Sequence, residues 1–360
     1  MNIEEAREFC LSIKGASESF PFDEHILVFK VMEKMFAYVS LNPKDSQFRI
    51  SMKCNPERSI ELRDHYTGII HGDHTASNLW NAVYIESDVP DNLIKELIQH
   101  SVDEVIKKLP QKKREEYFDI IHIKDCDSTN NTLTEINKTK RQEEGTILWS
   151  DFQSAGKGQR GNKWESEKGK NLLFSILLYP DVKASEQFII SQIVSLAIAE
   201  CLLAYTKDIA IKWPNDIYWK EKKICGILVE NRLIEDNIEQ SIVGIGININ
   251  QSKFISDAPN PVSLKQITEE QHNLFEILNK ARINILNYNR QLQSGNISFI
   301  RKRYKDFLFR SEGYHLYNDG KSDFAAKIKD LEPSGLLVLE TREGIERRFA
   351  FKEVKYILQT

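Results

Sequence analysis

Hydrophobic and polar positions divide the first part of the chain into helical and strand-like stretches. Apolar residues recur with helical spacing in residues 3–13, 56–66 and 91–107. They alternate or cluster as in strands in residues 25–41, 47–54 and 81–86. Pro56 stands where the first turn of a helix tolerates proline. The pattern predicts a sheet with helices at its ends, which is an α+β arrangement.

The middle of the chain alternates strand and helix patterns, and the last part contains short strands only. The predicted strands are residues 146–152, 170–179, 210–219, 225–234 and 241–249, and the predicted helices are 185–206 and 274–285. Residues 324–331, 335–341 and 346–354 predict short strands separated by turn signals. We therefore expect a central mixed sheet with helices, followed by a small β-barrel or meander.

A charged connector suggests where the first domain ends. Pro110 follows the helical pattern, a run of charges spans residues 112–116, and a new apolar alternation begins at Ile120. Such a connector is typical of a linker, although a solvated turn inside one domain would look the same. The predicted organisation is a domain over residues 1–110, a linker over 111–118, a second domain over 119–312 and a third over 313–360.

Composition and charge narrow the classes of protein. The 360 residues include 49 basic and 53 acidic side chains, a net charge of -4, which argues against non-specific nucleic-acid binding. The five cysteines are scattered without a CxxC pair, as in proteins of a reducing compartment. The N-terminus begins with early glutamates, unlike a signal peptide, and residues 189–205 are too polar to span a bilayer. We expect a cytoplasmic protein without membrane segments.

A glycine-rich stretch, DFQSAGKGQRGNKW at residues 151–164, follows a predicted strand. It contains GxGxxG, but no helical pattern follows, so a dinucleotide fold is not indicated. Asn162 also replaces the lysine that a phosphate-binding P-loop requires. Glycines allow the backbone to approach an anion closely, and three cations lie among them: Lys157, Arg160 and Lys163. The alternative is a flexible, solvated connection.

Polar residues at strand ends form a second group of candidates. Lys212, Asn215 and Asp216 end one predicted strand, and Lys223 begins the next. Such positions often face a cleft, and Asp216 could help to hold a metal–nucleotide complex. For Lys223 alone, an ordinary surface charge is the simpler interpretation.

Two further motifs carry polar groups beside glycine or helix-capping residues. Gly244 and Gly246 in a strand indicate close approach of a ligand or another backbone, or a β-bulge, and Asn248 adds an amide. In DCDSTNNTL, Asp127 or Ser128 could cap a helix, and Ser128 and Thr129 could hydrogen-bond a polar ligand head.

Four motifs in this order, GKGQRGNKW, KWPND, KKICGILVE and GIGIN, resemble those of biotin–protein ligase. DSTN upstream and the C-terminal β-segment also match, so the resemblance covers residues 118–360. It implies a class II synthetase-like mixed sheet with helices and a C-terminal SH3-like β-barrel. It further implies an enzyme that uses ATP and Mg²⁺ to form biotinyl-5′-AMP and transfers biotin to a lysine. The implied partner is the biotin carboxyl carrier protein of acetyl-CoA carboxylase or a related biotin-dependent carboxylase.

The resemblance also implies roles for individual residues. The implied catalytic residues are Lys223, Lys157 and Arg160. The implied biotin-binding residues are Ser128, Thr129, Asn130, Gln153, Gly156, Lys157, Gly158, Gln159, Trp164, Lys223 and Gly226. The implied nucleotide-binding residues are Lys212, Asn215, Asp216 and Asn248, with metal entering only as Mg-ATP near Asp216. The familiar loop reads GRGR, whereas here Lys157 and Gln159 replace two arginines, which changes the loop contacts.

The first segment resembles a different family. FPFDEHILVFKV, SLNPK, MKCNPERSIELR and LWNAVYIE are similar to the small MmcQ/YjbR-like proteins, which implies a double-wing α+β fold without an assigned activity. No winged helix-turn-helix is evident there, which argues against DNA binding. His65, His71 and His74 fit ordinary loop histidines better than metal ligands. Two alternatives stay open: a lipoate-type acyl ligase, and a binding or regulatory module acting through this domain.

Overall fold

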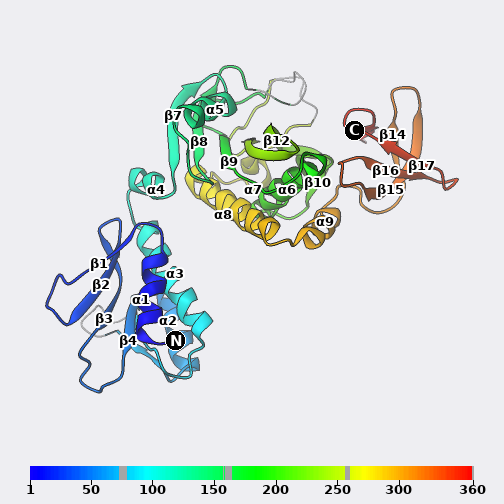
Figure 1. The fold of residues 1–360 in the computed structure, drawn as a ribbon. Helices are drawn as coiled ribbons and strands as arrows, with labels where there is room; N and C mark the ends of the chain where they lie inside the picture. Colours follow the sequence, from blue (N-terminus) through cyan, green and yellow to red (C-terminus); the bar gives the residue numbers. More distant parts are fainter. Residues whose placement is uncertain (73–78, 157, 159–163, 256–259, 359–360) are drawn as a thin grey trace. The chain divides into compact units, whose positions relative to one another are not determined.

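The chain forms two compact units, residues 1–118 and 119–360, in a computed structural model (Figure 1). The structure describes residues 1–72, 79–156, 158, 164–255 and 260–358. Each unit has its own sheet and its own buried core, so each is considered separately below.

Unit 1 is a six-stranded antiparallel sheet with strand order β1-β2-β3-β4-β6-β5. Its elements are α1 (Ile3–Ser12), β1 (Ala16–Ser19), β2 (Ile26–Val31), β3 (Lys34–Ser40), β4 (Arg49–Lys53), α2 (Pro56–His65), β5 (Ile69–His71), β6 (Trp80–Tyr84), α3 (Asp91–Lys107) and α4 (Gln111–Tyr117). The helix predicted to begin at Pro56 is confirmed, and the Asn55 side chain caps it by accepting hydrogen bonds from the Glu57 and Arg58 amides.

The core of unit 1 lies between one sheet face and the helices. Ile94, Ile98 and Val102 form the buried stripe of α3 and belong to the same apolar cluster as Ile50 and Val83 of the sheet. Residues 111–118, the predicted linker, consist mainly of helix α4 and lie in unit 1. A charge-rich sequence can form a solvated helix as well as a linker, and composition alone does not separate the two.

Unit 2 begins with a seven-stranded sheet of strand order β10-β11-β12-β13-β9-β8-β7. Its strands are β7 (Ile120–Cys126), β8 (Ile147–Gln153), β9 (Leu172–Leu178), β10 (Ile209–Lys212), β11 (Asp216–Trp219), β12 (Lys222–Ile234) and β13 (Asn237–Ile247). Its helices are α5 (Thr129–Thr139), η2 (Ala184–Glu186), α6 (Phe188–Leu203), α7 (Leu264–Thr268), α8 (Leu274–Gln293) and α9 (Ile297–Asp306). Among the described strands of this sheet, β7 and β8 pair in parallel and the other neighbours pair antiparallel, so the predicted mixed sheet is confirmed. Residues 210–219, expected as one strand, form the hairpin of β10 and β11.

The two faces of this sheet are covered by different helices. Helix α5 packs on one face through Leu133, which contacts Leu148, Leu177 and Ile242. Helices α6 and α8 pack against each other and against the sheet (Figure 1). Helix α6 is apolar almost all round and is buried accordingly. Within the described ranges, no helix is both long and apolar enough to cross a membrane.

The end of the chain forms a separate antiparallel sheet with the order β17-β16-β15-β14-β18. Its strands are β14 (His315–Asn318), β15 (Asp323–Leu331), β16 (Leu337–Thr341), β17 (Glu346–Phe349) and β18 (Lys355–Tyr356). The predicted short strands are confirmed, and no pairing closes this sheet into a barrel within the described residues. The sheet contacts the β10–β11 hairpin, because the Trp213 indole donates to the carbonyl of Gly335 at 3.0 Å.

Replacing Leu133 tests how strongly the α5 packing stabilises unit 2. Leu133 is fully buried, so Leu133→Ala removes apolar contacts and leaves a cavity. We expect the free energy of unfolding to fall by about 2–5 kcal/mol, measured by urea denaturation of the full chain. Glu135→Ala on the exposed side of the same helix is the matched control and should change stability far less. Equal effects of the two substitutions would contradict the assigned packing.

Candidate active site

Three glycines leave one face of the central sheet without side chains, so other groups can lie directly against its backbone. Gly226 of β12 is the cross-strand partner of Gly246 of β13, and Gly244 is two residues from Gly246 on the same face. A Cβ atom at Gly246 would lie 2.5 Å from Cε2 of Trp164, and one at Gly226 would lie 2.8 Å from Cζ3 of the same indole. The indole therefore lies directly against both strands. We call Gly226, Gly244 and Gly246 the glycine floor.

The first turn of α5 covers the third glycine of this floor. A Cβ atom at Gly244 would lie 2.5 Å from Oδ1 of Asn130. Thr129 donates to Oε1 of Gln153 from its backbone amide at 2.7 Å and from its hydroxyl at 3.1 Å. Ser128 occupies the N-cap position of α5 but makes no side-chain capping bond. Ser128 thus stands at the helix start, as the capping alternative expected, but its hydroxyl does not cap the helix. Polar groups of α5 and β8 gather beside the floor.

A β-bulge places Lys223 on the same face as the glycine floor. Lys223 and Gly226 are three positions apart, which in a regular strand would put them on opposite faces. The register shifts here, because Tyr218 opposes Lys223 whereas the preceding residue, Ile217, opposes Cys225. Such a bulge redirects a side chain. As a result, Cε of Lys223 would lie 3.4 Å from a Cβ atom at Gly226.

The ammonium group of Lys223 is held between an anion and an aromatic ring. Its Nζ atom lies 2.7 Å from Oδ1 of Asp216 and 5.9 Å from the ring centroid of Trp164. Both charged side chains are less than one-third exposed, so the pair is screened less than a surface pair. The cation predicted from the sequence therefore faces the glycine floor rather than bulk solvent.

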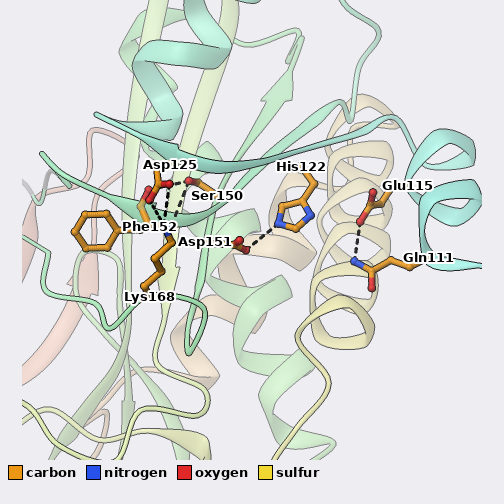
Figure 2. Close-up of polar contacts among 8 residues, drawn as sticks. All are labelled: Gln111, Glu115, His122, Asp125, Ser150, Asp151, Phe152 and Lys168. Atoms are coloured by element: carbon orange, nitrogen blue, oxygen red, sulfur yellow. Dashed lines mark hydrogen bonds and ion pairs between the residues drawn. The ribbon is translucent and has the colours of Figure 1, made fainter.

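The glycine-rich segment begins and ends beside the floor. The amide of Trp164 donates to the carbonyl of Gly156 at 3.0 Å, which joins the two ends of the segment. Further along, Lys168 forms an ion pair with Asp125 of β7, at 2.5 Å, and Figure 2 shows this contact near the end of β8. Lys157, Gln159 and Arg160 lie outside the described residues; Gly158 is described.

Lys212 lies at the boundary between the central sheet and the C-terminal sheet. Its Nζ donates to the hydroxyl of Tyr218 at 3.1 Å and lies 5.3 Å from the ring centroid of Tyr356 in β18. Burial lowers the pKa of Lys212, and the negative charge of Asp216 opposes this shift. Lys212 is also the cross-strand partner of Asp216, so it lies next to the Lys223–Asp216 pair.

The two asparagines predicted to bind nucleotide have different surroundings. Asn215 lies in the hairpin turn and is buried, with its amide donating to the carbonyl of Ile227 at 2.6 Å. The NH₂ group of Asn215 is therefore engaged within the sheet. Asn248 follows β13, and its buried Oδ1 has no hydrogen-bond partner among the described residues. That unpartnered oxygen is available to a ligand.

The structure brings most of the described candidates to one face of one sheet. Around the glycine floor lie Thr129, Asn130, Gln153, Gly156, Trp164, Lys223 and Gly226, with Asp216 beside them. Two residues that sequence reasoning missed join this group: Ser175, whose hydroxyl lies 2.6 Å from Oδ1 of Asn130, and Glu230, which accepts from the Asn130 amide at 2.6 Å. A serine within the apolar run LLFSILL was the available signal for the first.

The described residues of this site offer a cation and polar groups rather than a reactive thiol. Burial holds the pKa of the Cys225 thiol well above its ordinary value, so this thiol stays protonated. Among the described residues, no group of histidine, cysteine and acidic side chains is arranged to hold a metal ion. His74 lies outside the described residues. The remaining chemistry is that of a fixed ammonium group beside a flat, partly polar binding surface.

Comparisons with known proteins agree with the division of the chain. The model of the biotin/lipoate A/B protein ligase family matches residues 123–248, and the YjbR model matches residues 11–103. The bifunctional ligase/repressor BirA of Bacillus spizizenii is 30% identical over 240 residues, 62% of this chain and 70% of that protein. The uncharacterized protein YjbR of Escherichia coli is 28% identical over 114 residues, 32% of this chain and 95% of that protein.

A solved structure supports the fold of unit 2. The biotin protein ligase of Aquifex aeolicus, in complex with biotin and ATP, is 27% identical and superposes with a TM-score of 0.54. The match covers 66% of this chain and 99% of that structure. Both resemblances seen in the sequence are thereby confirmed. The chain belongs to the biotin protein ligase enzymes of the biotin/lipoate A/B protein ligase family, and it carries a YjbR domain before the ligase part.

Proposed function

We propose that the protein is an ATP-dependent, AMP-forming biotin–protein ligase that acts on the biotin carboxyl carrier protein. The observation that carries the proposal is the position of Lys223, whose ammonium group faces the glycine floor beside Asp216 and Trp164. The relatives named as biotin ligases, and the Aquifex aeolicus structure with biotin and ATP, support the choice of substrates.

In the first step, a carboxylate oxygen of biotin attacks the α-phosphorus of ATP, and the bond to the pyrophosphate oxygen breaks. Two anions must approach each other, so the main requirement is positive charge held in place. Lys223 supplies that charge at the floor, and Lys212 supplies a second cation near Asp216. Lys157 and Arg160, outside the described residues, are proposed to add charge from the glycine-rich segment.

Magnesium enters this proposal as the partner of ATP. Asp216 lies beside both lysines: it is paired with Lys223, and its charge acts on its cross-strand partner Lys212. One carboxylate fits a magnesium ion that already has phosphate and water ligands, because such ions keep several waters and few protein ligands. The ion would neutralise charge on the phosphates when bound.

In the second step, the neutral amine of a carrier lysine attacks the acyl carbon of biotinyl-5′-AMP. An amide bond forms, the bond to the phosphate oxygen breaks, AMP leaves, and the amine loses a proton. The indole of Trp164 lies over the sheet where the acyl group would be held, so it would limit the access of water to the mixed anhydride.

A transfer assay with two acids tests the proposal. We expect the full chain, with ATP and Mg²⁺, to attach biotin to a biotin carboxyl carrier domain, detected by a mass increase of the carrier. Lipoate with a lipoyl carrier domain is the parallel arm, because the matched family includes lipoate ligases. Polar groups gather at the first turn of α5, where we place the ring of the acid, and this favours the polar ureido ring of biotin. Transfer of lipoate alone would overturn the assignment.

Replacing Lys223 tests the proposed cation. Lys223→Ala removes the ammonium group that stabilises charge on the α-phosphate, so we expect the rate of adenylate formation to fall by roughly 100-fold or more. Pyrophosphate release in the presence of biotin and ATP, without carrier, measures this step. Lys222→Ala removes the neighbouring, exposed lysine and should keep the wild-type rate. Wild-type pyrophosphate release by Lys223→Ala would refute the role of Lys223.

Adding one methyl group to the glycine floor tests the close packing of the indole. In Gly246→Ala the new Cβ would lie 2.5 Å from the Trp164 indole, so the ring must move. We expect the dissociation constant for biotin, measured by calorimetry, to rise by about tenfold. We also expect Gly246→Ala to lower the melting temperature. Adding Trp164→Leu, which replaces the indole by a smaller side chain, should recover part of that loss. If both the affinity and the stability of Gly246→Ala match wild type, the described contact is wrong.

A further inference from the structure

A chain of hydrogen bonds runs along one face of the sheet, from the exposed Glu230 of β12 through the buried Ser175 to the first turn of α5. Glu230 accepts from Nδ2 of Asn130 at 2.6 Å, and the hydroxyl of Ser175 donates to Oδ1 of the same amide at 2.6 Å. The hydroxyl oxygens of Ser175 and Thr129 are 2.7 Å apart. Thr129 in turn contacts Gln153. We call these five residues the polar chain.

The members of the polar chain come from four separate elements that meet beside the glycine floor. Thr129 and Asn130 begin α5, Ser175 lies in β9, and Glu230 lies in β12. Ser175 is the cross-strand partner of Gly244, whose missing side chain makes room for Asn130. Ser175 is fully buried, and Thr129 and Asn130 are 3% exposed, so water does not satisfy their polar groups in place of these contacts.

The carboxylate of Glu230 fixes the direction of this chain. An ionised carboxylate accepts hydrogen bonds and donates none, so the NH₂ group of Asn130 must face Glu230. Its carbonyl oxygen then faces Ser175 and needs the single hydroxyl hydrogen of that serine. A charged acceptor also makes a stronger hydrogen bond than a neutral one, which favours this orientation of the amide over the flipped one.

The same reasoning extends to Thr129 and Gln153. The hydroxyl hydrogen of Thr129 has an acceptor inside the chain on either side, the oxygen of Ser175 or Oε1 of Gln153. The Thr129 oxygen therefore offers a lone pair, not a hydrogen, to a ligand. The Thr129 amide holds Oε1 of Gln153, so the Gln153 NH₂ group is turned to Gly156, 3.4 Å from where its Cβ would be. The hydroxyl oxygen of Thr129, an acceptor, and the NH₂ group of Gln153, a donor, therefore belong to neighbouring side chains.

We propose that Glu230 and Ser175 are positioning residues that orient Asn130 and Thr129, so that the site offers one acceptor beside one donor to a cyclic urea. A cyclic urea carries N–H donors next to a carbonyl acceptor, which complements this pair. The proposal rests on the proposed function, in which biotin is the substrate. It assigns a role in specificity to Ser175, which lies outside the quoted motifs, and to Glu230, the last residue of KKICGILVE, to which the resemblance assigned no role.

Steady-state kinetics of the full chain test the proposal. Glu230→Gln keeps the shape but supplies a side chain that can donate as well as accept, so Asn130 is no longer held in one orientation. We expect KM for biotin to rise on the order of tenfold, with KM for ATP and kcat close to wild type. Ser175→Ala should show the same pattern. Glu235→Gln, which removes the same charge from the exposed turn of the same hairpin, is the matched control.

A combined variant separates positioning from simple destabilisation. If the two residues act through one chain, Glu230→Gln with Ser175→Ala should raise KM for biotin no more than the stronger single substitution does. A melting temperature within a few degrees of wild type would exclude a general loss of folding as the cause. Unchanged KM for biotin in Glu230→Gln, or equal rises in KM for biotin and ATP, would overturn the proposal. If the wild-type chain bound no biotin in calorimetry, the proposed function itself would fail and the inference with it.

Discussion

The site depends on the absence of side chains at neighbouring positions of two paired strands. Gly226 and Gly246 oppose each other, and a single added carbon at either would lie within 3 Å of the Trp164 indole. Van der Waals repulsion is steep at such distances, so the indole could not lie against the backbone if either glycine carried a side chain. The other half of the same sheet face carries Leu148, Leu177 and Ile242, which bury α5. One face thus combines an apolar core with glycines on which Trp164 and Asn130 lie, and the boundary between them is where α5 begins.

Charge is placed by backbone geometry as much as by sequence. The bulge in β12 turns Lys223 to the floor, and the tight hairpin between β10 and β11 brings Asp216 within 2.7 Å of it. Lys212 precedes the same hairpin and is partly enclosed by Tyr218 and Tyr356, so the C-terminal sheet completes its surroundings. Cations so confined need little reorganisation when an anion arrives, which is the condition under which electrostatic stabilisation is most effective.

The sequence predicted helices and strands well where apolar residues follow one clear spacing, either helical or strand-like. The helix beginning at Pro56, the buried strand β9 and the apolar helix α6 all follow from local spacing. Motif order indicated the ligase family and most of the residues at the floor. Features that depend on which strands pair, and in which register, could not be predicted from the sequence. The bulge that turns Lys223, the inward amide of Asn215 and the contact between Glu230 and Asn130 all belong to this group.

The ion pair between Asp216 and Lys223 also has a consequence for selectivity among small acids. Asp216 and Lys223 lie on the paired strands β11 and β12, so Asp216 competes with any bound acid for the ammonium group of Lys223. As an intramolecular ligand, it has an effective concentration in the millimolar range or above. A free carboxylic acid must outcompete that internal counter-ion. A small acid that binds only through its carboxylate makes no further contact that would help it to displace Asp216. In the proposed reaction, an acid whose ring is also held by the sheet would have them, so the ion pair would disfavour the activation of acids that lack such a ring.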